Sequence, residues 1–148
     1  MSVEILEMTI SDFDEVHTLW ATTEGVGLTD GDTREGIAFY LQRNPGTSFV
    51  ARDGDHLVGA VLCGHDGRRG YLHHLAVLPS YRGQGIGTAL VDRCLAGLRT
   101  TGILKCNILV FADNISGESF WQKNGWSTRA DLTIRQRKTA NQSETLKD

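Results

Sequence analysis

Apolar and polar residues follow one another along this chain with a period that changes several times, and each change marks a predicted element. A period of two, or a short continuous apolar run, predicts a strand, whereas a spacing of three to four predicts a helix. Strand-type patterns cover residues 2–9, 47–79, 103–113 and 126–138, and helix-type patterns cover residues 11–23, 33–44, 85–100 and 114–125. Residues 139–148 show neither period and are expected to form a flexible tail.

Two Asp-Gly pairs, at 53–54 and 66–67, divide residues 47–79 into three predicted strands. Type I′ hairpin turns favour this dipeptide because both central residues need a positive φ. The three strands should therefore form an antiparallel meander. The helix at 85–100 then crosses over to the strand at 103–113, which places the two flanking strands parallel. We expect a mixed, mostly antiparallel α/β sheet in which one parallel pair splays apart to leave a crevice.

Composition narrows the class of protein. The 148 residues suit one domain, expected over residues 1–138, and 40% hydrophobic and 22% charged residues are ordinary for a globular protein. The net charge of −3 argues against a nucleic-acid partner. No apolar run approaches the roughly 18–20 residues of a membrane span. The acidic N-terminal segment also lacks the basic region of a secretory signal.

The cysteines point to a reducing compartment. Cys63, Cys94 and Cys106 are odd in number and show no C-x-x-C spacing, which argues against a disulfide framework and a structural zinc site. We expect them to be small buried hydrophobic residues. A cytoplasmic protein without a bound metal is the resulting expectation.

Three glycines at alternate positions, in the segment Arg-Gly-Gln-Gly-Ile-Gly-Thr at 82–88, stand where the helix at 85–100 should begin. The first N–H groups of a helix have no intrahelical partner, and glycines let several of them face one anion. A pyrophosphate would fit. The segment lacks the lysine of a Walker A loop, and its spacing is not that of the dinucleotide fingerprint. The alternative is a glycine-rich turn that only packs a helix tightly on a strand.

This segment resembles the R/Q-x-x-G-x-G/A signature of the Gcn5-related N-acetyltransferases (GNAT). The preceding Leu-His-His-Leu-Ala-Val-Leu-Pro (72–79) looks like the family's central strand, and Asn-Ile-Ser-Gly-Glu-Ser-Phe-Trp-Gln-Lys-Asn-Gly-Trp (114–126) is similar to its second motif. The element order matches from about residue 3 to 138, and the chain looks most like small stand-alone bacterial members.

The resemblance implies acetyl-CoA as donor and a CoA site built largely from backbone. It implies that backbone N–H groups hold the CoA pyrophosphate at Arg82, Gly83, Gln84, Gly85, Ile86, Gly87 and Thr88. The pantetheine arm would lie beside Leu75, Ala76 and Val77, with the N–H of Leu75 stabilising the oxyanion. The other side of the arm would be lined by Asn114, Gly117, Phe120 and Trp121.

The catalytic groups depart from the family pattern. Many members carry a carboxylate base on the central strand, which here reads Tyr71-Leu72-His73-His74-Leu75. By alternation, Tyr71, His73 and Leu75 should share one face, while His74 packs against a helix on the other. His73 is the candidate general base, and Tyr71 could position a water or the substrate. The alternative is that His73 only hydrogen-bonds a neighbour or faces solvent.

The leaving-group side also departs from the family pattern. Where the family commonly has a tyrosine acid, this chain has Trp121, whose indole N–H is no proton source near neutral pH. Packing beside the CoA arm is the simpler expectation for this side chain.

The predicted function is direct acetyl transfer from acetyl-CoA to a primary amine of a small molecule or peptide. The alternative is a non-catalytic acyl-CoA-binding sensor or partner module. The acidic loop at 24–32 is a hypothetical selector of cationic acceptors, and the loop at 64–70 is either an acceptor contact or a solvated hairpin. A second copy could pair with the exposed edge of the strand at 126–138.

Overall fold

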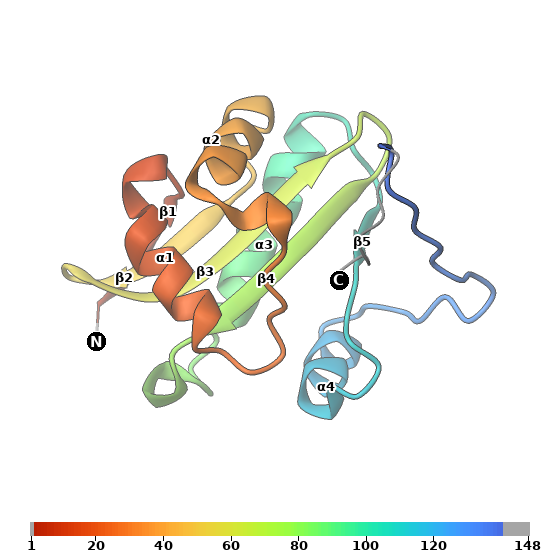
Figure 1. Ribbon diagram of the computed structural model, residues 1–148. Helices are drawn as coiled ribbons and strands as arrows, with labels where there is room; N and C mark the ends of the chain where they lie inside the picture. Colours follow the sequence, from red (N-terminus) through yellow and green to blue (C-terminus); the bar gives the residue numbers. More distant parts are fainter. Residues whose placement is uncertain (1, 141–148) are drawn as a thin grey trace. The chain divides into compact units, whose positions relative to one another are not determined.

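The computed structural model describes residues 2–140 and divides into two compact units, one ending at Leu109 and the other beginning at Val110 (Figure 1). The first unit contains the whole β-sheet and helices α1 to α3. The second contains helix α4.

The sheet of the first unit has five strands in sequence order: β1 (Val3–Glu7), β2 (Phe49–Asp53), β3 (His56–His65), β4 (Gly70–Val77) and β5 (Cys106–Ile108). Strands β1 to β4 are antiparallel, and β4 pairs with β5 in parallel. The mixed sheet with one parallel pair is therefore confirmed. The parallel pairing runs only from Gly70–Cys106 to Leu72–Ile108. Residues 73–77 of β4 extend beyond it, which is the predicted splay.

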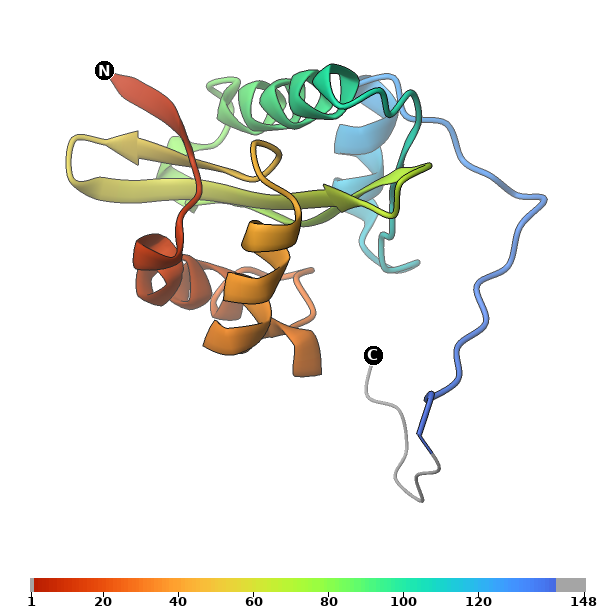
Figure 2. The ribbon, with the colours of Figure 1, turned by 90° about the horizontal axis from the view of Figure 1, so that it is seen from above.

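Helices cover both faces of this sheet. Figure 2 shows α1 (Phe13–Ala21) and α2 (Arg34–Arg43) along one face and α3 (Ile86–Thr100) along the other. Trp20 of α1 and Leu90 of α3 are fully buried, and each of the three helices directs an apolar stripe to the sheet. Three short 3-10 helices complete the unit: η1 (Ile10–Asp12), η2 (Asp30–Asp32) and η3 (Pro79–Tyr81). The cysteines Cys63 and Cys94 are buried as expected, whereas Cys106 is partly exposed.

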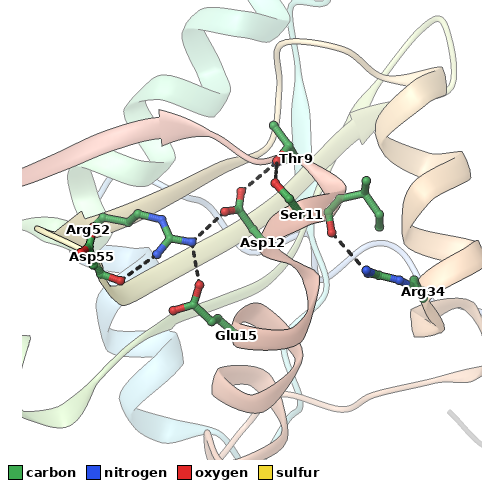
Figure 3. A network of polar contacts seen from close by, with 8 residues as sticks. Thr9, Ser11, Asp12, Glu15, Arg34, Arg52 and Asp55 are labelled. Atoms are coloured by element: carbon green, nitrogen blue, oxygen red, sulfur yellow. Dashed lines mark hydrogen bonds and ion pairs between the residues drawn. The ribbon is translucent and has the colours of Figure 1, made fainter.

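A charged network fastens the start of α1 to the sheet. Arg52 of β2 donates to Asp12 at 2.8 Å, to Glu15 at 2.9 Å and to the carbonyl of Asp55 at 3.1 Å (Figure 3). Asp12 also accepts the N–H of Thr9 at 2.9 Å and so closes the capping box of η1. These contacts fix the angle at which the chain leaves β1 and enters α1.

The hairpin turns differ from the type I′ prediction. The β2–β3 loop consists of Gly54 and Asp55, because Asp53 pairs with His56, and only Gly54 has a positive φ, of 62°. In the β3–β4 turn only Gly67 has a positive φ, of 95°. The Asp66 side chain there accepts the N–H groups of Arg68 and Arg69, each at 2.8 Å. The aspartates act as ordinary strand-end and turn-capping residues, so the type I′ prediction was wrong.

The second unit holds one helix, α4 (Ile115–Lys123), and an irregular chain up to residue 140. The predicted strand at 126–138 is absent from these described residues, and Leu132 and Ile134 remain exposed there. The strand edge proposed for pairing with a second copy is therefore absent as well. Most of the predicted tail, from residue 141 onward, lies outside the described residues.

Candidate active site

A β-bulge interrupts β4 beside the splay. Leu62 of β3 pairs with His73, and Ala60 pairs with Ala76, so His74 and Leu75 together face the single residue Val61. A bulge leaves its extra residue out of the ladder and turns the strand locally. The bulge therefore falls at the residues predicted to carry the catalytic groups.

Both histidines lie on the α1–α2 face of the sheet. The His73 ring lies 6.2 Å from the ring of Tyr40 in α2, and the His74 ring lies 4.9 Å from that of Trp20 in α1. The two imidazoles are 6.1 Å apart, centre to centre. The prediction that His74 occupies the face opposite His73 was wrong, because the bulge breaks the alternation between them. The prediction that His74 packs against a helix is confirmed.

His74 has a strained backbone and a fixed side chain. Its φ of 58° is positive, and among the described residues no other non-glycine residue has a positive φ. Its Nε2 lies 3.0 and 3.1 Å from the two carboxylate oxygens of Asp32 in η2. Burial acts to raise the pKa of Asp32, but hydrogen bonds from His74 and Thr29 lower it on balance. Asp32, one of the acids of the loop at 24–32, is thus bound to a histidine of β4, and the role of that loop in acceptor selection stays a hypothesis.

A pocket of about 190 Å³ opens beside His73, between the end of α2, the β3–β4 turn and the start of β4. Its wall is largely aromatic, and its polar groups include the guanidinium of Arg43. The lining residues are Phe39, Tyr40, Arg43, Asn44, Gly64, His65, Asp66, Tyr71 and His73.

Two pKa shifts define the chemistry of this pocket. Burial lowers the pKa of His73; the neighbouring His74 adds to this effect and the Asp32 carboxylate partly opposes it. His73 is therefore a neutral imidazole at pH 7. Burial also raises the pKa of Tyr40, which keeps its phenol protonated. The predicted residues Tyr71 and His73 do meet in one pocket, whereas Tyr40 and Arg43 carried no signal in the sequence beyond helix periodicity.

The glycine segment adopts the open conformation that an anion site requires. Gly83 and Gly85 have positive φ values of 77° and 81°, and a Cβ added at either would meet no atom within 4 Å. Gly85 is the N-cap of α3, and among the described residues no side chain caps that end. Within residues 2–140, no backbone carbonyl accepts the N–H groups of residues 83–87.

Arg82, the first residue of the glycine segment, is hydrogen-bonded to β4. The Arg82 side chain donates from Nε to the carbonyl of Val77 at 3.0 Å. The Arg82 N–H donates to Pro79 at 3.3 Å, so it is already engaged, unlike those of the glycines that follow. Ile86, Gly87 and Thr88 form the first turn of α3. The backbone of this chain thus fits a pyrophosphate at residues 83–87.

The second-motif residues form their own local structure in the second unit. Asn114 caps α4 by accepting the N–H of Gly117 at 3.0 Å. Trp121 packs edge-on against Phe120 and Trp126, with ring centres 4.9 and 5.2 Å away. These contacts agree with a packing role for Trp121, and the predicted contacts of Asn114, Gly117, Phe120 and Trp121 with CoA stay predictions.

Comparison with known proteins agrees with this geometry. The family model described as the acetyltransferase (GNAT) family matches residues 13–126. An acetyltransferase of Sodalis glossinidius (strain morsitans) is 35% identical over 121 residues, which are 82% of this chain and 84% of that protein. The chain therefore belongs to the acetyltransferase (GNAT) family. It is an acyl-CoA-dependent acetyltransferase of the small bacterial type.

Solved structures show the same fold at low identity. Ard1 from Thermoplasma volcanium superposes with a TM-score of 0.77 at 22% identity, covering 88% of this chain and 86% of that one. The PaiA N-acetyltransferase from Thermoplasma acidophilum, in complex with coenzyme A, gives a TM-score of 0.74 at 22% identity and covers 87% and 92%. Among residues 2–140, no helix combines the length and apolarity needed to cross a membrane.

Proposed function

We propose that this protein transfers an acetyl group from acetyl-CoA directly to a primary amine in a ternary complex. One observation carries the proposal. The β4 edge beyond its pairing with β5 leads, through the Arg82–Val77 hydrogen bond, to the N–H groups of residues 83–87, which no backbone carbonyl of the described residues accepts. This arrangement offers one continuous stretch of backbone to an extended ligand that ends in a pyrophosphate. The PaiA structure contains coenzyme A in the same fold.

The donor supplies an activated acyl thioester, and the chain positions it. The glycine loop would bind the pyrophosphate, while Leu75, Ala76 and Val77 would receive the pantetheine arm along β4. The N–H of Leu75, which lies in the bulge, would donate to the oxygen of the tetrahedral intermediate. In comparable sites one such donor contributes about 3–4 kcal/mol to the barrier.

The acceptor would occupy the pocket beside His73. An alkyl ammonium is mostly charged at pH 7, so it must lose a proton before it attacks. Neutral His73 would accept that proton, directly or through a water placed by Tyr71. The amine nitrogen then bonds to the acyl carbon, the C–S bond breaks, and the CoA thiolate leaves. The nitrogen loses its second proton to solvent as the amide forms, and solvent returns a proton to the thiolate.

A covalent acyl-enzyme does not fit this site. A hydrogen bond with Cys63 and burial both raise the pKa of the Cys106 thiol, which keeps it protonated and poorly nucleophilic. Cys63 and Cys94 are buried. We therefore assign the attack to the acceptor itself.

A two-stage experiment tests the proposal. Calorimetry with CoA and acetyl-CoA measures donor binding, and a thiol-release assay over polyamines, aminoglycosides, amino acids and short peptides measures turnover. We expect micromolar donor binding and turnover with at least one amine class. Binding without turnover would support the sensor alternative, and absence of binding would overturn both functions.

A further inference from the structure

We infer that Asp32 is a positioning residue that holds the β4 bulge in its working conformation through His74. The inference rests on the proposed function, in which Leu75 and His73 flank the reacting groups. Asp32, in the connection between α1 and α2, contacts His74, which lies 42 residues later in the sequence. Among the described non-glycine residues, His74 alone has a positive φ.

The backbone of His74 is unfavourable in isolation. A left-handed conformation reduces the population of a non-glycine residue roughly five- to thirtyfold, because its Cβ approaches the following carbonyl. Such a conformation persists only where the surroundings impose it. Glycine would adopt it without this cost, so at a histidine the contacts of the side chain must hold the conformation in place.

Two contacts hold the His74 ring in place. Nε2 bonds the Asp32 carboxylate, and Trp20 packs edge-on with its centre 4.9 Å away. Trp20 is fully buried, and its indole N–H has no partner among the described residues, so it restrains the ring by packing. His74 is therefore fixed at its tip and along one edge.

Asp32 is itself anchored, which makes it a suitable support. It is 8% exposed, and it accepts the N–H of Thr29 at 2.8 Å as part of the capping box of η2. The carboxylate therefore cannot follow the histidine if the strand relaxes. Loss of the pair would let His74 return to an extended conformation and move both neighbours, His73 and Leu75, on the strand.

The substitutions separate a backbone role from a chemical one. In Asp32→Ala we expect kcat to fall roughly five- to thirtyfold with the KM for acetyl-CoA within about twofold, since the glycine loop is untouched. In Asp32→Asn an acceptor oxygen remains, so kcat should recover to within about threefold of wild type. Glu35→Ala, which removes an exposed acid three residues further along the chain and outside the loop at 24–32, is the matched control and should change neither value.

The decisive variant is His74→Gly. It removes the Asp32–His74 contact, but glycine adopts a positive φ without steric cost. It should retain kcat within about threefold, whereas His74→Ala should lose as much as Asp32→Ala. An equal loss in His74→Gly and His74→Ala would overturn the inference, because the imidazole would then act chemically.

A readout without turnover distinguishes failure of this inference from failure of the proposed function. NMR of the free protein reports the sign of φ at residue 74 from the intraresidue amide–Hα contact. Wild type and His74→Gly should show a positive φ, and Asp32→Ala should lose it. A positive φ that survives in Asp32→Ala would overturn the inference, even if no amine in the panel were acetylated.

Discussion

Gly85 gives the sharpest test of the CoA assignment, because the structure separates the cost of a side chain there from its effect on binding. Its φ of 81° is left-handed, and an added Cβ would meet no atom within 4 Å. Gly85→Ala should therefore cost only backbone strain, about 1–2 kcal/mol, which is about 2–8 °C in Tm for a chain of this size. The domain should stay folded.

Binding should suffer far more than stability. An alanine either places a methyl group where the pyrophosphate approaches or turns the N–H groups of residues 83–87 away from it. A hydrogen bond to a charged group contributes about 1.5–3 kcal/mol, so the loss of one should weaken CoA binding roughly 10- to 150-fold. Calorimetry with CoA measures this directly.

Gly102 supplies the matched control at the opposite end of the same helix. Its φ is 84°, and an added Cβ there also meets nothing within 4 Å. Gly102→Ala should lower Tm by about the same amount and leave the Kd of CoA unchanged. If both variants bind CoA like wild type, the glycine loop does not hold the pyrophosphate.

Three further outcomes are expected. The free energy of unfolding should fall as the pH drops below 6.5, because burial lowers the pKa of His73 in the folded state and the unfolded chain therefore binds one more proton. Urea titration at several pH values measures this fall, which should be smaller in His73→Asn. Gly64→Ala should raise the KM for the acceptor roughly tenfold or more, because the added Cβ would collide with Tyr40 in the pocket wall. An unchanged KM would mean that the acceptor binds outside this pocket. Arg52→Met should lower stability by about 1–3 kcal/mol by leaving Asp12, with 13% of its side chain exposed, without its ion-pair partner. The double variant with Asp12→Asn should recover part of this loss, and additive losses would contradict the coupling.

The spacing of apolar residues predicted most helices and strands of the first unit, because each of these elements buries side chains at regular intervals along the chain. The helix expected at 85–100 is observed at Ile86–Thr100, and Gly102 follows its end with a positive φ. The glycine segment was recognised from its spacing at a helix start, and the positive φ values of Gly83 and Gly85 agree with the open backbone expected there. These features depend on residues that are neighbours in the sequence.

The failures share a different cause. Alternation places side chains on a strand only while each residue faces one partner, and the bulge gives Val61 two. What fixes that bulge is an acid 42 residues away, and no local pattern encodes such a contact. The strand expected at 126–138 failed for a related reason. Its alternation is real, but Leu132 and Ile134 are 61% and 62% exposed, so no sheet partner receives them.

In the proposed site, backbone groups contact the donor, whereas side chains contact the acceptor. In the proposed site the donor would bind to the N–H groups of residues 83–87 and to the edge of β4 beyond its pairing with β5, and neither depends on side-chain identity beyond the glycines. The reacting centre would need one backbone N–H at the bulge, which the Asp32–His74 pair can hold without any carboxylate on β4. Under the proposed mechanism, neutral His73 would serve as the base although β4 carries no carboxylate, because the oxyanion donor would remain in place. Acceptor choice would then rest on the pocket wall, above all on Arg43 and Tyr71, and substitutions there should exchange one amine for another while CoA affinity stays constant.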